Sequence, residues 1–250
     1  MENSIIQTKN LNIYHETQCI LRDININIQA NKTTAFMGPS GVGKSSLLQV
    51  LCGQKKPKSG QLTFNNVHQN TEKNLKTGIL FQNNALLLHL TVFENVALPI
   101  RYHFNLPETI IEDIVLMKLH AVNLKHAAHL YPEQLSGGML RRAAIARSIA
   151  MDPNLIFYDE PFSGQDPINT ESIAKLIKKM NKYLDATSII ITHEVNLTLQ
   201  LADYIYIFDK QTIAFHGPPH KVTSSKNDFV KSFLTPSIQT QLSTSEKKPC

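Results

Sequence analysis

The sequence has few cysteines and no long hydrophobic run, and both shortages limit what the protein can be. Its 250 residues include three cysteines, Cys19, Cys52 and Cys250, which lie far apart and form no Cys-x-x-Cys pair. A disulfide framework and a zinc site are therefore not expected, and a reducing compartment fits. The longest apolar runs, such as 85–88 and 188–191, are far shorter than the ~20 residues that a membrane-spanning helix needs.

The sequence also lacks a targeting signal and a dense block of positive charge. The first ten residues do not show the cationic and then apolar pattern of a secretory signal, which predicts a cytosolic location unless a partner carries the chain to a membrane. The net charge of +5 would suit nucleic acid or an anionic membrane face. No run of five or more lysines and arginines occurs, so a generally solvated basic surface is favoured and no nucleic-acid partner is expected.

Short apolar runs alternate with helical patterns along most of the chain. Residues 24–28 alternate isoleucine with asparagine, which is typical of a strand with one solvated face. Continuous apolar runs predict strands buried on both faces at 33–37, 79–81, 155–158, 188–191 and 205–208. Apolar residues at helical spacing predict helices at 45–52, 139–149 and 168–184. This alternation predicts an α/β fold.

Residues 83–150 show no clear strand and predict a helical lobe inserted into the α/β core. Thr91 and Glu94 have the spacing of a capping box before an apolar run. Pro107 suits the first turn of another helix that continues to about residue 119. We therefore expect one domain over 1–222 with this lobe inside it, followed by a C-terminal extension over 223–250 that ends in a flexible tail.

The segment 38–45, Gly-Pro-Ser-Gly-Val-Gly-Lys-Ser, is a phosphate-binding P-loop. Its glycines, Gly38, Gly41 and Gly43, allow successive backbone N–H groups to point at one anion, and the following helix adds its positive end. Lys44 would contact the β- and γ-phosphates of a nucleoside triphosphate, and the Ser45 hydroxyl would bind Mg²⁺. The other residues predicted to contribute to this site are Pro39, Ser40, Val42 and Ser46.

Two further segments carry groups that a nucleotide-hydrolysing site needs. The buried strand 155–158 is followed by Asp159, which could hold Mg²⁺ directly or through water, and by Glu160, which could orient or deprotonate the attacking water. Ser136, Gly137 and Gly138 precede a helix and form a second possible anion site. Taken alone, the first could be an ordinary strand end and the second an ordinary helix cap.

These motifs, in this order, resemble those of the ATP-binding-cassette (ABC) ATPases from about residue 5 to residue 216. The resemblance implies a RecA-like core with an antiparallel β subdomain and a helical lobe. It implies that Tyr14 stacks on adenine, that Gln82 senses Mg²⁺ and the γ-phosphate, and that His193 is the switch histidine. It also makes 135–139 the signature loop that caps ATP held by the opposite subunit, and 163–166 the D-loop with Asp166. Singly, Tyr14 and His193 could be ordinary structural residues.

Two departures from the common family pattern narrow the resemblance. Met139 replaces the usual glutamine of the signature, and 164–167 reads Gly-Gln-Asp-Pro. Both are similar to the Mla-type lipid-transport ATPases, which act at the cytoplasmic face of the inner membrane of Gram-negative cells. That similarity implies a phospholipid cargo, a transmembrane permease, a small soluble regulatory subunit and a periplasmic lipid-binding protein.

The expected mechanism is a head-to-tail dimer that sandwiches two ATP molecules. Each ATP would rest on Lys44 of one chain and on 136–138 of the other, with Glu160 as the base and His193 on the γ-phosphate. Exposed apolar residues at 86–90 could contact the permease or simply pack within the lobe. The alternatives are an ABC ATPase with another cargo, such as a hydrophobic compound or an amino acid, a soluble nucleic-acid-linked ABC ATPase, and a P-loop kinase.

Overall fold

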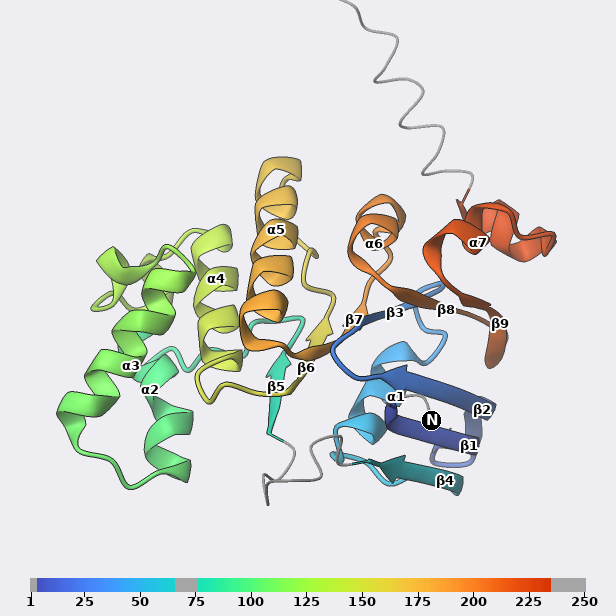
Figure 1. Ribbon diagram of the computed structural model, residues 1–250, viewed down its shortest axis with the longest axis horizontal. Coiled ribbons are helices and arrows are strands. Elements are labelled where there is room, and N and C mark those ends of the chain that lie inside the picture. The colour runs from blue at the N-terminus through green and yellow to red at the C-terminus, as the bar shows by residue number, and fades with distance from the viewer. Residues whose placement is uncertain (1–3, 66–75, 235–250) are drawn as a thin grey trace, which may run out of the picture. The chain divides into compact units, whose positions relative to one another are not determined.

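The computed structural model describes residues 4–65 and 76–234, which divide into two compact units (Figure 1). The first unit comprises residues 1–67 and 189–250, and the second comprises residues 68–188. The predicted domain of 1–222 with its lobe and extension stays a prediction. The predicted flexible tail lies outside the described residues.

The first unit contains a three-stranded antiparallel sheet in the order β2-β1-β4. Its strands are β1 (Ser4–His15), β2 (Gln18–Gln29) and β4 (Ser59–Phe64). Ile24, Ile26 and Ile28 of β2 are buried whereas Asn25 is exposed, so the predicted alternation is confirmed. The antiparallel β subdomain that the resemblance implied is thus present, and it extends further than the sequence pattern indicated.

The same unit holds the strands on which the P-loop is built. β3 (Thr33–Met37) pairs in parallel with β8 (Tyr204–Asp209), and β8 pairs antiparallel with β9 (Thr212–Gly217). Helices α1 (Lys44–Leu51), α6 (Val195–Leu201) and α7 (Pro219–Thr223) belong to the same unit. Met37 and Ile207 pack in one apolar cluster with Val230 and Leu234, so part of the predicted extension belongs to the core of this unit. β7 (Thr187–Ile191) spans the boundary of the two units.

The second unit pairs β5 (Thr77–Leu80) in parallel with β6 (Leu155–Asp159). Its α-helices are α2 (Val92–His103), α3 (Glu108–Ala121), α4 (Gly137–Ser148) and α5 (Pro167–Leu184), and two 3-10 turns, η1 (Lys125–Ala127) and η2 (Pro132–Gln134), connect α3 to α4. Helices α2, α3 and α4 pack on one another and form a helical lobe (Figure 1). This lobe matches the fold that the resemblance implied.

Local hydrogen bonds explain where the helices of the lobe begin. Thr91 Oγ1 accepts from the N–H of Glu94 at 3.2 Å and the N–H of Thr91 donates to Glu94 Oε2 at 2.7 Å, so the predicted capping box is present. Pro107 is the N-cap of α3 rather than a member of its first turn. Helix α4 begins at Gly137, two residues earlier than predicted, because Ser136 caps it by accepting from the N–H of Met139 at 3.4 Å.

Within residues 4–65 and 76–234, no helix has the length and apolar character required to cross a membrane. The longest described helix, α5, has 18 residues and carries charged residues along its solvent-exposed face. Its buried residues, such as Ile173, Ile177 and Met180, recur at helical spacing as predicted.

Candidate functional site

The P-loop joins β3 to α1 and adopts a backbone that requires glycine. The φ angles of Gly38, Gly41 and Gly43 are 142°, 79° and 106°. A Cβ on Gly38 would lie 2.5 Å from the carbonyl oxygen of Phe208, and a Cβ on Gly43 would lie 2.6 Å from Cγ2 of Ile20. At both positions φ is positive and there is no room for a side chain, so glycine is required.

Lys44 folds back over this loop. Its Nζ donates hydrogen bonds to the carbonyl oxygens of Gly38 at 2.8 Å and of Pro39 at 2.9 Å, and the residue is 7% exposed. The N-cap of α1 is Gly43, which offers no side-chain acceptor to the first turn, and Ser45 is exposed on that turn. The first turn of α1 thus offers backbone N–H groups beside a lysine ammonium, and both favour an anion.

Two more predicted residues belong to the same unit. The N–H of Thr192 donates to the carbonyl of Phe36 at 3.2 Å, which places the exposed His193 beyond the same strand end as the P-loop. Tyr14 is half-buried in β1 and pairs with Cys19 of β2. Ile20, the next residue of β2, is the side chain that lies against Gly43, so the β1–β2 hairpin carries Tyr14 towards the loop.

In the second unit, the register of β5 and β6 brings another group of predicted residues to one strand edge. Leu80 is paired with Tyr158, so Gln82 and the pair Asp159 and Glu160 follow neighbouring strand ends. Glu160 has a φ of 46°, a left-handed conformation that costs a non-glycine residue roughly 1–2 kcal/mol. The N–H of Ser163 donates to the Glu160 carbonyl at 3.2 Å and closes the turn that imposes this conformation. Such strain is common at functional sites.

The signature and D-loop segments are both helix caps. Ser136 and Gly137 are exposed at the start of α4, and a Cβ on Gly138 would lie 2.9 Å from Asn169 Oδ1. Asp166 caps α5 by accepting from the N–H groups of Ile168 at 3.0 Å and Asn169 at 2.9 Å. The N–H of Asn169 is the main reason that the pKa of Asp166 lies below its ordinary value. The Asp166 carboxylate therefore has a structural task, whatever else it contacts.

The structure thus gathers the predicted residues into two groups. Tyr14, the P-loop residues 38–46 and His193 belong to the first unit; Gln82, residues 136–138, Asp159, Glu160 and Asp166 belong to the second. Among the described residues, no three histidine, cysteine, aspartate or glutamate side chains come together as a metal cluster.

Sequence reasoning missed two arginines of α4 that hold the loop after β5. Arg141 donates to the carbonyls of Phe81 and Gln82, each at 3.0 Å, and Arg147 donates to the carbonyls of Asn84 at 3.0 Å and Ala85 at 2.6 Å. The sequence shows both arginines in a helical pattern, but their acceptors lie about 60 residues earlier in the chain. No local signal identifies such a pairing.

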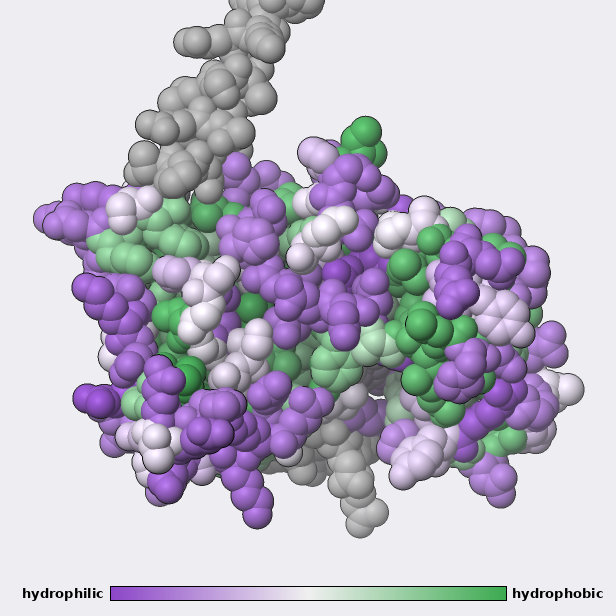
Figure 2. Space-filling model, turned by 180° about the vertical axis from the view of Figure 1, so that it is seen from behind, coloured by the Kyte–Doolittle hydropathy of each residue, from purple (hydrophilic) through white to green (hydrophobic). Residues whose placement is uncertain are grey.

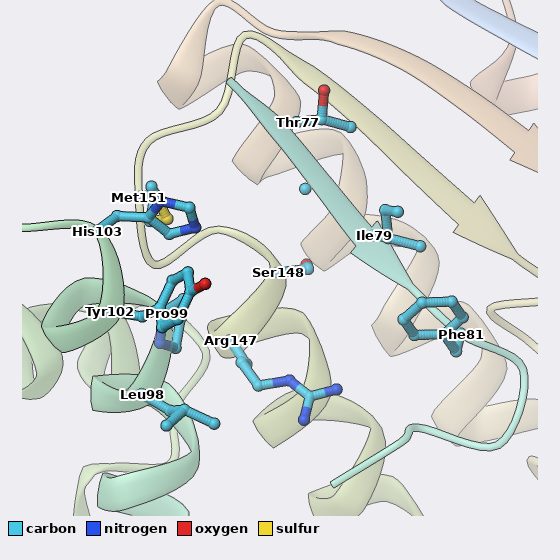
Figure 3. A pocket seen from close by; sticks show the side chains of 11 residues that line it. Thr77, Ile79, Phe81, Leu98, Pro99, Tyr102, His103, Arg147, Ser148 and Met151 are labelled. Carbon is cyan, nitrogen blue, oxygen red and sulfur yellow. The ribbon is translucent and has the colours of Figure 1, made fainter. Parts of the chain in front are cut away.

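A hollow of about 440 Å³ lies beside this loop, within the second unit (Figure 3). It is lined by β5, the last turns of α2 and the end of α4, and Arg147 reaches into it between Leu98 and Phe81 (Figure 3). Leu98 and Tyr102 are 41% and 83% exposed. Figure 2 shows hydrophobic surface gathered on this part of the lobe, on the right of the view.

Comparison with known proteins explains this set of motifs. The sequence profile of the family described as "ABC transporter" matches residues 21–163. The ATP-binding protein MlaF of the intermembrane phospholipid transport system of Haemophilus influenzae is 44% identical over 241 residues, which are 94% of this chain and 91% of that protein. The chain belongs to the ABC transporter family.

Solved ABC structures agree with the fold. The cbiO1 component of the cbiONQ ABC transporter complex of Clostridium perfringens has a TM-score of 0.80 and 30% identity, covering 97% of this chain and all of that one. A dimeric ABC cassette bound to ADP and phosphate after hydrolysis has a TM-score of 0.76 and 28% identity, covering 86% of this chain and 99% of its own. As an ABC cassette, the chain binds ATP and hydrolyses it, and such cassettes form dimers that work with membrane permease subunits.

Proposed function

We propose that this chain is the ATP-hydrolysing subunit of a transporter that moves phospholipids between the inner and outer membranes of a Gram-negative envelope. The observation that carries this proposal is the 44% identity, over nearly the full length of both chains, to a protein named for intermembrane phospholipid transport. Met139 and the Gly-Gln-Asp-Pro segment at 164–167, which depart from the common ABC pattern, support the same subgroup. The alternative is an ABC ATPase that energises another cargo.

The nucleotide would be held mainly by the first unit. In this proposal Tyr14 stacks on adenine and the P-loop residues 38–46 surround the phosphates. Lys44 has its ammonium 2.8 Å and 2.9 Å from two loop carbonyls, so it is already held at the loop where the phosphates would bind. This preorganisation is the main physical support for assigning the phosphates to this loop.

The available donors suit Mg²⁺. Ser45 offers an exposed hydroxyl, Gln82 an amide oxygen, and Asp159 a carboxylate at a strand end, and these are the hard oxygen ligands that Mg²⁺ prefers. Mg²⁺ is usually bound by one or two such groups together with substrate phosphates rather than by an all-protein cage. Bound Mg²⁺ would neutralise charge on the β- and γ-phosphates.

Glu160 and His193 are the proposed catalytic residues. The backbone of Glu160 lies in a hydrogen-bonded turn after β6, which suits a group that must orient or deprotonate one water molecule. His193 follows the strand end next to the P-loop and would contact the γ-phosphate. Hydrolysis would remove the γ-phosphate that bridges the two subunits, and this loss releases the closed dimer.

The second anion site would act on the nucleotide of another copy. Ser136 and Gly137 are exposed at the N-terminus of the 12-residue helix α4, where backbone N–H groups favour an anion. A two-fold dimer would then use each surface twice and bind two ATP molecules between the subunits, with Asp166 near the shared interface.

The hollow beside Phe81 is the proposed docking place for a helix of the permease. It is apolar, it adjoins the loop that carries Gln82, and it has the exposed Leu98 and Tyr102 on its rim. Leu87 and Leu88, which are exposed in the same loop, would extend this contact. The chain would thereby attach to the cytoplasmic face of the inner membrane, in an assembly that includes a small soluble regulatory subunit and a periplasmic lipid-binding protein.

The test is affinity capture of tagged Glu160→Gln protein from detergent-solubilised native membranes, followed by mass spectrometry of bound proteins and lipids. We expect a permease together with phospholipid. Tyr102→Asp in the same background should lose the permease while it keeps ATP binding, whereas Tyr183→Asp, an exposed tyrosine on α5 outside the hollow, should keep both. A permease that copurifies without phospholipid would contradict the proposed phospholipid cargo. Capture of nucleic acid with no membrane partner would contradict the proposed role in a membrane transporter.

A further inference from the structure

Arg141 is a deeply buried charged side chain that the proposed mechanism does not use. It lies in the second turn of α4, two residues after the signature loop, and is 2% exposed. A buried guanidinium is costly unless its N–H groups find acceptors, because it loses its hydration. The hydrogen-bond acceptors of Arg141 therefore indicate its role in the structure.

Those acceptors belong to two different catalytic segments. Nη1 donates to the carbonyl of Phe81 at 3.0 Å, and Nη2 donates to the carbonyl of Gln82 at 3.0 Å and, at a longer 3.4 Å, to the carbonyl of Ser163. Phe81 and Gln82 follow β5, and Ser163 closes the turn that begins at Glu160. One planar side chain thus connects the backbone that follows β5 to the backbone that follows β6, the strand that ends at Asp159.

The strand pairing between β5 and β6 stops short of these segments. The ladder between β5 and β6 ends at the pair Leu80 and Tyr158, before the residues that carry the chemistry. Beyond that pair, the backbone continues as turns, with positive φ at Glu160 and Gly164. The guanidinium connects the two segments beyond the last pair of the β5–β6 ladder, since its planar geometry fixes the distance between the carbonyls that accept its hydrogen bonds.

The charge of Arg141 also acts on its surroundings. Burial lowers the pKa of Arg141, and the negative charge of Asp159 acts in the opposite direction. An arginine remains protonated at neutral pH even with such a shift. Its Nε is buried without a hydrogen-bond partner among the described residues, so an apolar side chain would suit a mere packing role better.

We propose that Arg141 is a positioning residue for ATP hydrolysis, which holds the Gln82 segment and the turn after Glu160 in one arrangement. The inference rests on the proposed roles of Gln82, Asp159 and Glu160. Arg141 thereby connects α4, the helix that begins within the signature loop, to the Gln82 segment and to the turn after Glu160. Any movement of the start of α4 would be transmitted to the backbone at Gln82 and Ser163 through the same three hydrogen bonds.

The neighbouring Arg142 provides a matched control. It also sits on α4 and also makes a forked contact, to the carbonyl of Val122 at 3.1 Å and to Ser172 Oγ at 2.8 Å. Neither acceptor belongs to a catalytic segment. Replacing each arginine by lysine keeps the charge but exchanges a rigid fork for a point donor that cannot serve two or three separated acceptors.

The experiment measures ATP hydrolysis by the full-length chain in its isolated transporter complex, as a function of ATP and of Mg²⁺, together with the melting temperature. For Arg141→Lys we expect kcat to fall about tenfold or more, because a loosened catalytic group loses effective positioning. We also expect the half-saturating Mg²⁺ concentration to rise several-fold, while ATP affinity measured without Mg²⁺ changes less than about twofold because it depends on the P-loop. Arg142→Lys should lower the melting temperature but leave kcat and the Mg²⁺ dependence within about twofold.

If Arg141→Lys lowers only the melting temperature, as Arg142→Lys does, Arg141 is a packing residue and the inference is wrong. If Arg141→Lys does not fold, Arg141→Gln is measured in the same way, and wild-type kcat and Mg²⁺ dependence in that folded variant would equally overturn it. Absence of ATP hydrolysis in the wild-type complex would instead contradict the proposed function. The two failures are therefore distinguishable.

Discussion

Lys44 illustrates how single residues of this protein are prepared for an anion. Lys44 is buried, which would be unfavourable for its charge if two loop carbonyls did not accept hydrogen bonds from the ammonium. One of those carbonyls belongs to Gly38, whose φ of 142° and close approach to the backbone of β8 leave no room for a side chain. The lysine contact and the requirement for glycine thus meet at the same residue.

Removing this ammonium should weaken nucleotide binding. For Lys44→Ala we expect ATP affinity to fall roughly 10- to 100-fold, because a hydrogen bond to a charged group contributes about 1.5–3 kcal/mol. The affinity can be measured by isothermal titration or by a fluorescent ATP analogue. Lys58→Ala, which removes an exposed lysine of the same unit, should bind ATP normally. Unchanged affinity in Lys44→Ala would contradict the assignment of the phosphates to this loop.

At the level of elements, the side chain of Tyr206 forms hydrogen bonds with the backbone of strand β2. The hydroxyl of Tyr206 in β8 accepts from the N–H of Asn27 at 3.0 Å and donates to the carbonyl of Asn27 at 3.2 Å. It therefore satisfies both backbone groups of one β2 residue, as a neighbouring strand would. The phenol links the antiparallel sheet to the strands that carry the P-loop within the first unit.

Tyr206→Phe should destabilise the protein by about 1–3 kcal/mol, since it leaves two backbone groups without this partner. Burial raises the pKa of Tyr206 from 10.0 to about 12. Because the folded state holds its proton more tightly, this contribution is complete below pH 10 and is lost as the pH rises towards 12. Denaturant unfolding at several alkaline pH values should show that loss in the wild type and a weaker one in Tyr206→Phe.

The control for this experiment is Tyr183→Phe, because Tyr183 is 68% exposed on α5. That variant should retain both the stability and the alkaline pH dependence of the wild type. If Tyr206→Phe were as stable as Tyr183→Phe, the double hydrogen bond to Asn27 would contribute nothing measurable to the fold.

The elements differ in how well the sequence predicts them. Strand β3 and helix α5 were predicted to within a residue, because their apolar periodicity and their flanking residues are local signals. The sequence pattern did not predict that β1 pairs with both β2 and β4, because β4 lies some 50 residues from β1 and carries little apolar pattern. Pairing between distant segments is decided by packing rather than by propensity.

The same distinction holds for the site. The P-loop, Ser136 as a cap and the pair Asp159 and Glu160 were identified from short motifs whose geometry is local. The role of Asp166 as the cap of α5 follows from the structure, although its place before Pro167 is a cap signal that could have been used.

For the whole molecule, the motifs are divided between two units, and an ABC cassette completes its function in a dimer. In the proposed dimer, the exposed Ser136 and Gly137 would be half of an interface rather than a complete site. Blocking hydrolysis should trap this dimer, because the γ-phosphate that both subunits contact is retained.

Glu160→Gln should therefore bind ATP, elute at twice the mass of the monomer in the presence of ATP and Mg²⁺, and lose about 100-fold or more of its turnover. Size-exclusion chromatography with light scattering measures the mass, and phosphate release measures the turnover. Adding Lys44→Ala to this variant should abolish the ATP-dependent dimer. Near-normal hydrolysis by Glu160→Gln would show that Glu160 is not the base.

The sequence alone determined that this protein binds a nucleoside triphosphate and which family it resembles, because glycine conformation, helix capping and strand-end carboxylates are properties of adjacent residues. Only the tertiary structure decided how the segments that carry Gln82, Glu160 and the signature are joined. The acceptors of Arg141 lie 60, 59 and 22 residues away along the chain. No pattern in the sequence relates residues at those separations, because they meet only when the chain has packed and the guanidinium is buried among them.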